Sequence, residues 1–306
     1  MQLGAVEVTD AVCALIGIMS YVIHGATGAQ GAPVVAALVA AGKPVTALTR
    51  KTDAVIEGAR VMAADLSSSE QLVSAYRGAD GVFVHLPMGD KDDVRKYVHN
   101  ILSALREARP GRVVFSTSGP VVDLPGSVLQ QPADSPVAAM VAGLEDSGLS
   151  WTVLTPRLFL ENLLLPPIGA VVREQGVLRF PLRADFPVSW VSHRDVADAA
   201  VAALLDHPEV TGLVGVGQVP AITGADLAEA FGGRLGRDVT YQAITPEEFG
   251  EMLAPLIGAG PAAGVAGLYR LLATVPDFAI ASERSAQTLL GITPRTADQW
   301  LADIRL

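Results

Sequence analysis

The chain has 306 residues, of which half are hydrophobic and 18% are charged, and its formal net charge is −10. This composition predicts a globular protein with a sizeable core, and the negative charge argues against a nucleic-acid-binding surface, which needs a basic stripe. One cysteine excludes a disulfide framework, and no apolar run approaches the roughly eighteen residues of a membrane-spanning helix. We therefore expect a cytoplasmic monomer or homodimer that binds a small molecule, without a nucleic-acid or membrane partner.

Residues 1–19 form an expected N-terminal extension. The stretch Ala11 to Met19 is apolar, but Glu7 and Asp10 precede it and no Lys or Arg does. A secretory signal requires a positive segment before its apolar part, so we reject that interpretation. We expect the first core strand near Tyr21.

The segment from Tyr21 to Thr49 predicts a strand, a tight turn, a helix and a second strand. The apolar run 21–24 ends in GATGAQG at 25–31, a helix of small residues follows over 32–41, and 44–49 has strand composition. A glycine-rich turn in this context is typical of a dinucleotide-binding site. The alternative is a structural glycine loop without a ligand.

Each glycine of this turn has a specific expected role. Gly25 permits the tight turn, Gly28 lets the backbone approach a pyrophosphate, and Gly31 lets the helix pack close to the strand. The helix N-terminus then offers unpaired N–H groups to the phosphates. The second strand ends in Arg50 and Lys51, which suit a 2′-phosphate and so favour NADP(H) over NAD(H). A solvated basic pair is the alternative.

Strands and helices continue to alternate as far as Pro156. The fold class that this predicts is α/β, a Rossmann-type doubly wound parallel sheet over residues 20–156. The expected strands are 59–66, 81–87, 112–118 and 151–156, and the expected helices are 67–76, 90–108 and 136–147.

Residues 157–306 should form a smaller substrate-binding α/β lobe, with some segments returning to the Rossmann sheet, and we expect the substrate cleft at the lobe boundary. The small-residue run 257–267 looks the most flexible. The lobe's expected helices are 159–165, 195–205, 224–232 and 245–253, and its expected strands are 188–191 and 212–217.

Polar residues at the ends of the expected strands are the candidate catalytic groups. His85 ends the fourth strand, where it could donate a proton near neutral pH; the alternative is a histidine satisfied by the backbone. Thr117 and Ser118 end the fifth strand, where they either bind a substrate oxygen or close a turn. His24 is expected to belong to the core rather than to a ligand site. No group of residues has metal-ligand spacing, so no metal is expected.

Further on, the chain offers fewer candidates. Asn162 either points into the cleft or caps a turn, and Glu161 is expected to be solvated or paired. The letters of His193-Arg194-Asp195 match a kinase catalytic loop, but no kinase glycine loop or lysine accompanies them. Asp195 is instead expected to cap the following helix.

Several segments together carry a resemblance to a known family. They are GATGAQG, TALTRK, AADL, WTVLTPRLFLENLL, VSWVSHRDVADAAVAAL and TGADLAEAFGGRLGRDVTYQAITPEEF. The chain resembles the NmrA-like branch of the atypical short-chain dehydrogenases/reductases over roughly residues 20 to 303. This family includes NADPH-dependent quinone, flavonoid and azo reductases, as well as proteins that bind the dinucleotide and regulate partners without turnover.

The resemblance implies roles for individual residues. Thr117 and Ser118 would lie at the end of the fifth strand, and Phe159 and Asn162 would face the substrate cleft. The implied cofactor contacts are Gly25, Thr27, Gly28, Gln30 and Gly31 at the pyrophosphate, Arg50 and Lys51 at the 2′-phosphate, Asp65 and Leu66 near the adenine, and Leu86 and Pro87 near the nicotinamide.

The chain departs from the superfamily at its proton-transfer pair. None of the five tyrosines has a lysine four residues on, and Ala133 and Val137 stand where the family pattern places Tyr and Lys. Reduction of a plain ketone would suffer, because general acid help is worth about two to four powers of ten. We therefore predict an NADPH-dependent oxidoreductase that reduces a quinone-like or conjugated carbonyl compound. The alternative is a non-catalytic NADP(H) sensor that binds a protein partner.

Overall fold

The computed structural model describes residues 20–51 and 53–304, so the expected extension 1–19 lies outside the described residues. The contacts between residues divide the chain into two compact units, which are described separately. Within the described residues, the first unit comprises the chain up to Pro120, Gln131–Leu154 and Val196–Leu213. The second unit comprises Val121–Gln130, Thr155–Asp195 and the chain from Val214 onward.

The first unit is built on a sheet of seven strands in the order β3-β2-β1-β4-β5-β6-β8. Pairing is parallel from β3 through to β6. The order reverses beside β1, and open α/β sheets bind ligands at the carboxyl ends of strands at such a switch point. The last residues of β6 and β8 belong to the second unit. The strands are β1 (Tyr21–Ile23), β2 (Val45–Thr49), β3 (Arg60–Ala63), β4 (Gly81–His85), β5 (Val113–Ser116), β6 (Trp151–Pro156) and β8 (Gly212–Val216).

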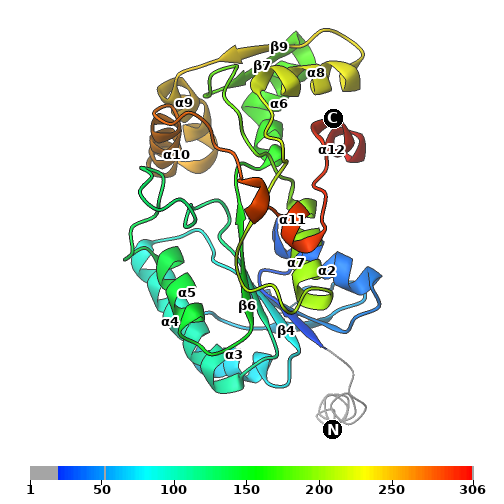
Figure 1. The fold of residues 1–306 in the computed structure, drawn as a ribbon, viewed down its shortest axis with the longest axis vertical. Coiled ribbons are helices and arrows are strands. Elements are labelled where there is room, and N and C mark those ends of the chain that lie inside the picture. Colours follow the sequence, from blue (N-terminus) through cyan, green and yellow to red (C-terminus); the bar gives the residue numbers. More distant parts are fainter. Residues whose placement is uncertain (1–19, 52, 305–306) are drawn as a thin grey trace. The chain divides into compact units, whose positions relative to one another are not determined.

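Helices cover both faces of this sheet. In Figure 1, α3, α4 and α5 lie along one side of the strands and α2 and α7 along the other. Between the sheet and the helices α3, α4 and α5 lies a core that includes Val82, Val84, Ile101 and Phe115, all fully buried. The near-continuous apolar sequence of β4 follows from its burial on both faces. The helices are α2 (Gly31–Ala40), α3 (Ser69–Tyr76), α4 (Lys91–Ala108), α5 (Pro136–Glu145) and α7 (His193–Leu205), which begins in the second unit.

The second unit has an aromatic core. The ring of Phe180 lies 5.3–5.4 Å from the rings of Trp190, Phe249 and Tyr269, at the steep angles that aromatic pairs favour. Two parallel strands, β7 and β9, pair beside this cluster. The elements are η1 (Leu160–Leu164), α6 (Pro166–Gln175), β7 (Val177–Phe180), α8 (Gly224–Leu235), β9 (Thr240–Ala243), α9 (Pro246–Ile257), α10 (Ala259–Leu272), η2 (Ser282–Arg284), α11 (Ala286–Leu290) and α12 (Ala297–Asp303).

The structure of this unit differs from the sequence-based expectation in two places. The run 188–191 is not a strand, because Val188 and Val191 make only isolated bridges to three different segments. The run 257–267, the stretch whose sequence looks the most flexible, is almost entirely helical: Ile257 ends α9, and 259–267 belong to α10. Small residues there let α10 pack closely on α9: a Cβ added to Gly250 would lie 3.2 Å from the Cβ of Ala266.

The described residues contain no helix that combines the length and the apolar character needed to cross a membrane. They also contain no group of three or more His, Cys, Asp or Glu side chains that could hold a metal ion.

Candidate functional site

The glycine turn after β1 brings three backbone segments into close contact. Gly25 has φ +56°, in the left-handed region that favours glycine. The N–H of Gly28 donates to the carbonyl of Gly25 at 2.7 Å. A Cβ added to Gly31 would lie 2.3 Å from the Gly25 oxygen and 2.5 Å from the His24 oxygen. Only a glycine at position 31 lets α2 start this close to the strand end.

Gln30 precedes α2, but its side chain does not cap the helix. Its amide nitrogen donates to Ser118 Oγ at 2.7 Å, and its amide oxygen accepts from Ser116 Oγ at 2.8 Å. Two hydroxyls at the end of β5 therefore hold the carboxamide. The side chain of Gln30 is therefore engaged within the protein. Its backbone is the part that could contact a pyrophosphate.

A cavity of about 360 Å³ lies beside the glycine turn, at the carboxyl ends of β1, β2 and β4. It includes nine of the residues expected to bind the cofactor or take part in the reaction, and it does not include Gln30, Gly31, Leu86, Thr117 or Ser118. His24, expected to belong to the core, also lines it. The nine are Gly25, Thr27, Gly28, Arg50, Lys51, Asp65, Leu66, His85 and Pro87.

Sequence reasoning missed the wall of this cavity that the start of α4 provides. Met88 follows β4 and is fully exposed, and Asp90, Asp93 and Tyr97 also line the cavity. Their spacing of three and four residues places them on one face of a helix, a signal present in the sequence. Asp90 caps α4 by accepting from the N–H of Asp92 at 2.9 Å.

Arg50 and Lys51 line the cavity and are exposed. Within residues 20–51 and 53–304, neither cation forms an ion pair. The carboxylate of Asp65 accepts from the N–H and hydroxyl of Ser67, which lowers its pKa, and the charge of Arg50 lowers this pKa further. Two exposed cations therefore line the cavity without forming an ion pair with a described carboxylate.

Two histidines flank the glycine turn. His24 is buried directly after β1, and its Nε2 lies 2.6 Å from the hydroxyl of Tyr76. Burial, together with the charge of His85, lowers the pKa of His24 to about 3, so it is a neutral core residue. His85 packs against the turn itself, because a Cβ on Gly25 would lie 2.3 Å from His85 Nε2.

The end of β5 carries the other two candidate catalytic residues. Thr117 is 2% exposed, and its Oγ1 has no hydrogen-bond partner among the described residues. Ser118 has φ +62°, uncommon for a residue with a side chain. Its bond to Gln30 ties this strained residue to the glycine turn.

The expected substrate residues Phe159 and Asn162 belong to the second unit. Phe159 stacks on the ring of His193, with 4.5 Å between the ring centroids. Asn162 lies within η1, half-buried, and its side chain makes no hydrogen bond to a described residue. It therefore does not cap a turn of the described chain.

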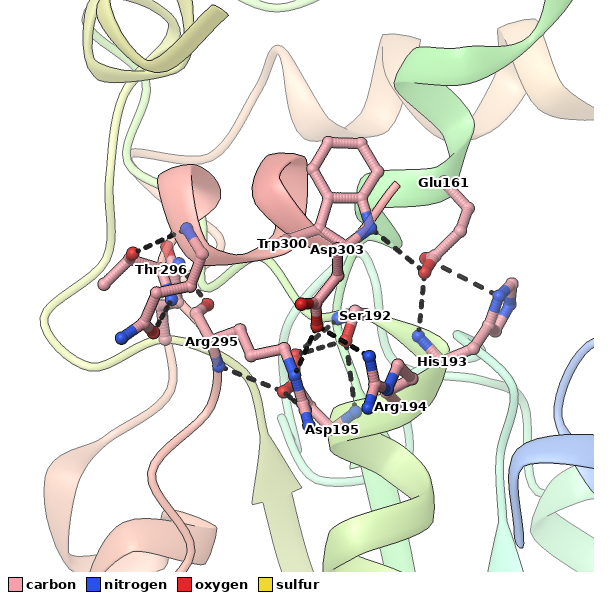
Figure 2. Close-up of polar contacts among 11 residues, drawn as sticks. Glu161, Ser192, His193, Arg194, Asp195, Arg295, Thr296, Trp300 and Asp303 are labelled. Atoms are coloured by element: carbon pink, nitrogen blue, oxygen red, sulfur yellow. Dashed lines mark hydrogen bonds and ion pairs between the residues drawn. The ribbon is translucent and has the colours of Figure 1, made fainter. Parts of the chain in front are cut away.

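Glu161 is paired rather than solvated. Its Oε1 accepts from the backbone N–H of His193 at 3.1 Å and from the indole of Trp300 at 3.3 Å. Its Oε2 lies 3.5 Å from His193 Nδ1. Figure 2 shows Glu161 between His193 and Trp300, so one carboxylate joins η1, α7 and α12.

Asp195 closes the start of α7 through reciprocal contacts. Its carboxylate accepts from the N–H of Ser192 at 2.8 Å, and Ser192 Oγ accepts from the N–H of Asp195 at 3.1 Å, which is a capping box. Arg295 also donates to Asp195 at 2.7 Å. Asp195 thus serves the helix start, as expected, with Ser192 as the N-cap residue.

The parallel sheet, its switch point and the glycine turn define a dinucleotide-binding protein of the Rossmann class. The family model described as the NmrA-like family matches residues 20–301, and the chain belongs to this family. The structure thus confirms the predicted fold class.

Three known proteins illustrate what the chain is similar to. It is 32% identical over 232 residues to an NAD(P)H azoreductase of Xenophilus azovorans, covering 74% of this chain and 77% of that protein. It is 31% identical over 229 residues to the (4-alkanoyl-5-oxo-2,5-dihydrofuran-3-yl)methyl phosphate reductase of Streptomyces griseus, covering 72% and 76%. The NADPH-dependent quinone oxidoreductase of Escherichia coli, solved with NADPH, superposes with a TM-score of 0.70 at 19% identity, covering 93% of this chain and 99% of that chain.

Proposed function

We propose that the protein is an NADPH-dependent oxidoreductase that reduces a quinone-like or conjugated carbonyl compound by direct hydride transfer. One observation carries the proposal: the cavity of the first unit joins the glycine turn to Arg50 and Lys51, which have no carboxylate partner in the described chain. The turn suits a pyrophosphate, and the two cations suit a 2′-phosphate.

The residues around the cavity fit the parts of such a cofactor. Gly25, Thr27 and Gly28 would hold the pyrophosphate through backbone groups, and Asp65 and Leu66 would border the adenine. A larger residue at position 28 would crowd the turn, because an added Cβ would lie 3.2 Å from the Gly25 oxygen. When bound, the reduced nicotinamide supplies a hydride.

The chemistry of the acceptor follows from what the chain lacks. Without a Tyr-x-x-x-Lys pair, the favoured acceptors are those whose reduced form is a stabilised anion, as with quinones. The two relatives above 30% identity support this class: one is named an azoreductase, and the other reduces a compound whose name contains an unsaturated oxo-dihydrofuran ring. Both acceptor groups are conjugated.

The roles of several residues belong to this proposal. His85, which packs against the glycine turn, would contact the nicotinamide or the acceptor, with Leu86 and Pro87 at the nicotinamide side. Thr117 and Ser118 would supply polar contacts. In the second unit, Phe159 and Asn162 would contact the acceptor. Among these, Thr117 Oγ1 is a buried group without a partner in the described chain, and such groups call for a ligand or a water.

The test is NADPH oxidation with a panel of quinones, azo dyes, enones and simple ketones, using NADPH that carries deuterium at C4. We expect steady turnover with conjugated acceptors, deuterium in the reduced product, and slow or no turnover with simple ketones. Tight NADPH binding without oxidation by any acceptor would contradict the proposal. The cofactor-sensor function, which the missing Tyr and Lys favour, would then take its place.

A further inference from the structure

Opposite charges line the cavity of the first unit, and they come from different elements. Arg50 and Lys51 directly follow β2, whereas Asp90 and Asp93 belong to the start of α4. Phosphate groups are attracted by the cations and repelled by the carboxylates. The part of a dinucleotide that lies against α4 should therefore be a part that carries no phosphate.

Tyr97 is half-buried and lines the cavity one helical turn beyond Asp93. The next turn of α4 is bound to the loop after β3, because Nδ2 of Asn100 donates to the carbonyl of Leu66 at 2.9 Å. Residues three apart lie on the same face of a helix, so Tyr97 lies beside this loop. Leu66 lines the cavity as well. An aromatic residue of α4 and an apolar residue of the loop thus border the same space.

Hydrogen bonds from two helices fix the loop after β3. The N–H of Asp65 donates to Gln71 Oε1 of α3 at 2.9 Å. The N–H of Ser67 donates to the Asp65 carboxylate at 2.9 Å, and α4 holds the carbonyl of Leu66. A wall that is already ordered costs little conformational entropy when a ligand binds to it. The space between this loop and α4 is therefore preformed.

The position of the 2′-phosphate decides which base of the dinucleotide occupies this space. In NADPH the 2′-phosphate is attached to the ribose that carries adenine, so a 2′-phosphate bound by Arg50 brings adenine to the groups near this cation. Asp65 is such a group, because the charge of Arg50 adds to the hydrogen bonds from Ser67 in lowering its pKa. Leu66 follows Asp65 in the chain, and Tyr97 lies beside Leu66.

We propose that Tyr97 is the residue of α4 that binds the adenine of NADPH, with the base packed between its ring and the side chain of Leu66. This assignment rests on the proposed function, from which it takes the cofactor and the 2′-phosphate contact. The adenine ring is flat and has two apolar faces, and an aromatic side chain is the group on which a base stacks most favourably. Tyr97 thus contributes to the affinity for the cofactor.

The first test measures the binding of adenosine 2′,5′-bisphosphate, which contains the adenine end of NADPH and no nicotinamide, by titration calorimetry. Tyr97→Ala should weaken binding by about tenfold or more, because it removes the aromatic face. Tyr97→Phe keeps that face and should change the affinity by less than about threefold. The Tyr97 hydroxyl has no hydrogen-bond partner among the described residues, so its removal breaks no bond of the described fold.

The matched control is His99→Ala, at an exposed position two residues further along α4 that does not line the cavity. This variant should bind the bisphosphate as tightly as wild type does. Wild-type affinity in Tyr97→Ala, or an equal loss in His99→Ala, would overturn the assignment.

The second test locates the base by NMR in wild type, so it does not depend on the folding of Tyr97→Ala. Nuclear Overhauser effects are measured between the adenine H2 and H8 protons of the bisphosphate and the tyrosine ring protons, and the spectrum of Tyr97→Phe identifies the Tyr97 signals. We expect contacts between adenine and Tyr97. With NADP⁺ as the ligand, contacts of Tyr97 with the nicotinamide protons in place of the adenine protons would contradict the assignment.

The outcomes separate this assignment from the proposed function. If wild type oxidises NADPH with quinones but the bisphosphate binds equally well to wild type and Tyr97→Ala, the assignment fails and the proposed function stands. If the bisphosphate contacts Tyr97 but no acceptor oxidises NADPH, the assignment stands for a cofactor sensor and the proposed function fails. If wild type binds neither the bisphosphate nor NADPH, both fail.

Discussion

The two units satisfy their buried polar side chains in different ways. In the first unit the partners are neutral: His24 meets the Tyr76 hydroxyl, Gln30 meets two serines, and Arg112, 3% exposed, donates to backbone carbonyls and hydroxyls. In the second unit, two buried side chains are paired with an opposite charge. Arg157, also 3% exposed, forms two parallel hydrogen bonds of 2.9 Å with Asp123, and Asp195 accepts from Arg295.

The difference shows two solutions to one physical problem. A buried charge is costly unless hydrogen bonds or an opposite charge compensate it. Arg112 spreads its charge over the carbonyls of His207, Pro208 and Val210, and so holds the connection between α7 and β8. Arg157 concentrates its charge on one carboxylate from the Val121–Gln130 segment, so each partner depends on the other.

The largest expected effect is on the second unit. Arg157→Met should lower the free energy of unfolding by about 3–5 kcal/mol, because it leaves the Asp123 carboxylate buried and unpaired. Adding Asp123→Leu should recover most of this loss. Urea unfolding followed by tryptophan fluorescence measures both. Arg183→Met, at an exposed pair, is the control and should change stability by less than about 0.5 kcal/mol. A double variant as unstable as the single one would contradict the mutual dependence.

The corresponding change in the first unit is Arg112→Met. It should cost about 2–3 kcal/mol, because several neutral acceptors lose a charged donor but no charge is left unpaired. No second substitution should restore stability, since most of the acceptors are backbone carbonyls. The same urea experiment measures the loss. A cost as large as that of Arg157→Met would remove the distinction between the units.

The substitution Arg50→Ala tests whether a cation that forms no ion pair in the described chain binds the cofactor. Arg50→Ala should weaken NADPH binding by about 1.5–3 kcal/mol, roughly one to two powers of ten, through lost charge-assisted hydrogen bonds. NADH binding should hardly change. Titration calorimetry with both cofactors decides this, with Arg60→Ala as a control on the neighbouring strand. Equal affinities of wild type for NADPH and NADH would contradict the cofactor assignment.

His24 provides a pH test of the neutral network. Burial lowers the pKa of His24 to about 3 in the folded protein, against an ordinary value of 6.5, so the unfolded state binds more protons between these values. Its contribution to stability is present above pH 6.5 and is lost as the pH falls, by about 1.4 kcal/mol at pH 5.5. Unfolding of wild type and His24→Asn, measured from pH 8 to 5, should show the smaller slope in the variant.

The smallest effect is expected for Tyr97→Phe. Of the five tyrosines, all of them described, Tyr97 is the one that lines the cavity. If proton delivery does not depend on a tyrosine, its loss should reduce kcat by less than tenfold, well below the hundredfold or more of a general acid. Loss of turnover with NADPH binding retained would identify Tyr97 as the acid instead.

The sequence predicts the first unit well because its signals are local. The glycine turn and the apolar run of β4 can each be recognised from a few consecutive residues. The apolar residues of α4 recur at helical spacing. In the second unit the deciding contacts are distant in sequence. β7 pairs with β9 some sixty residues on, and the run 188–191 has strand composition but makes isolated bridges to three segments. No local pattern encodes such pairings.

The same contrast applies to the candidate sites. Nine cavity residues could be identified from strand ends and from the family resemblance. The contacts of Glu161 could not, because His193 lies 32 residues away along the chain and Trp300 lies 139 away. The sequence His193-Arg194-Asp195 matches an unrelated kinase motif. The carboxylate that faces the His193 ring is that of Glu161, which belongs to η1.

The path of the chain has a consequence for anyone who wants to divide this protein into parts. Residues 155–195 belong to the second unit, and the chain that follows them, Val196–Leu213, belongs to the first again. Val121–Gln130 belongs to the second unit although the chain before and after it belongs to the first. A gene fragment ending at Pro156 would lack the last strand of the sheet and the connection that Arg112 holds. A hybrid that exchanges only the second unit between two relatives therefore requires three separate stretches of DNA to be replaced together.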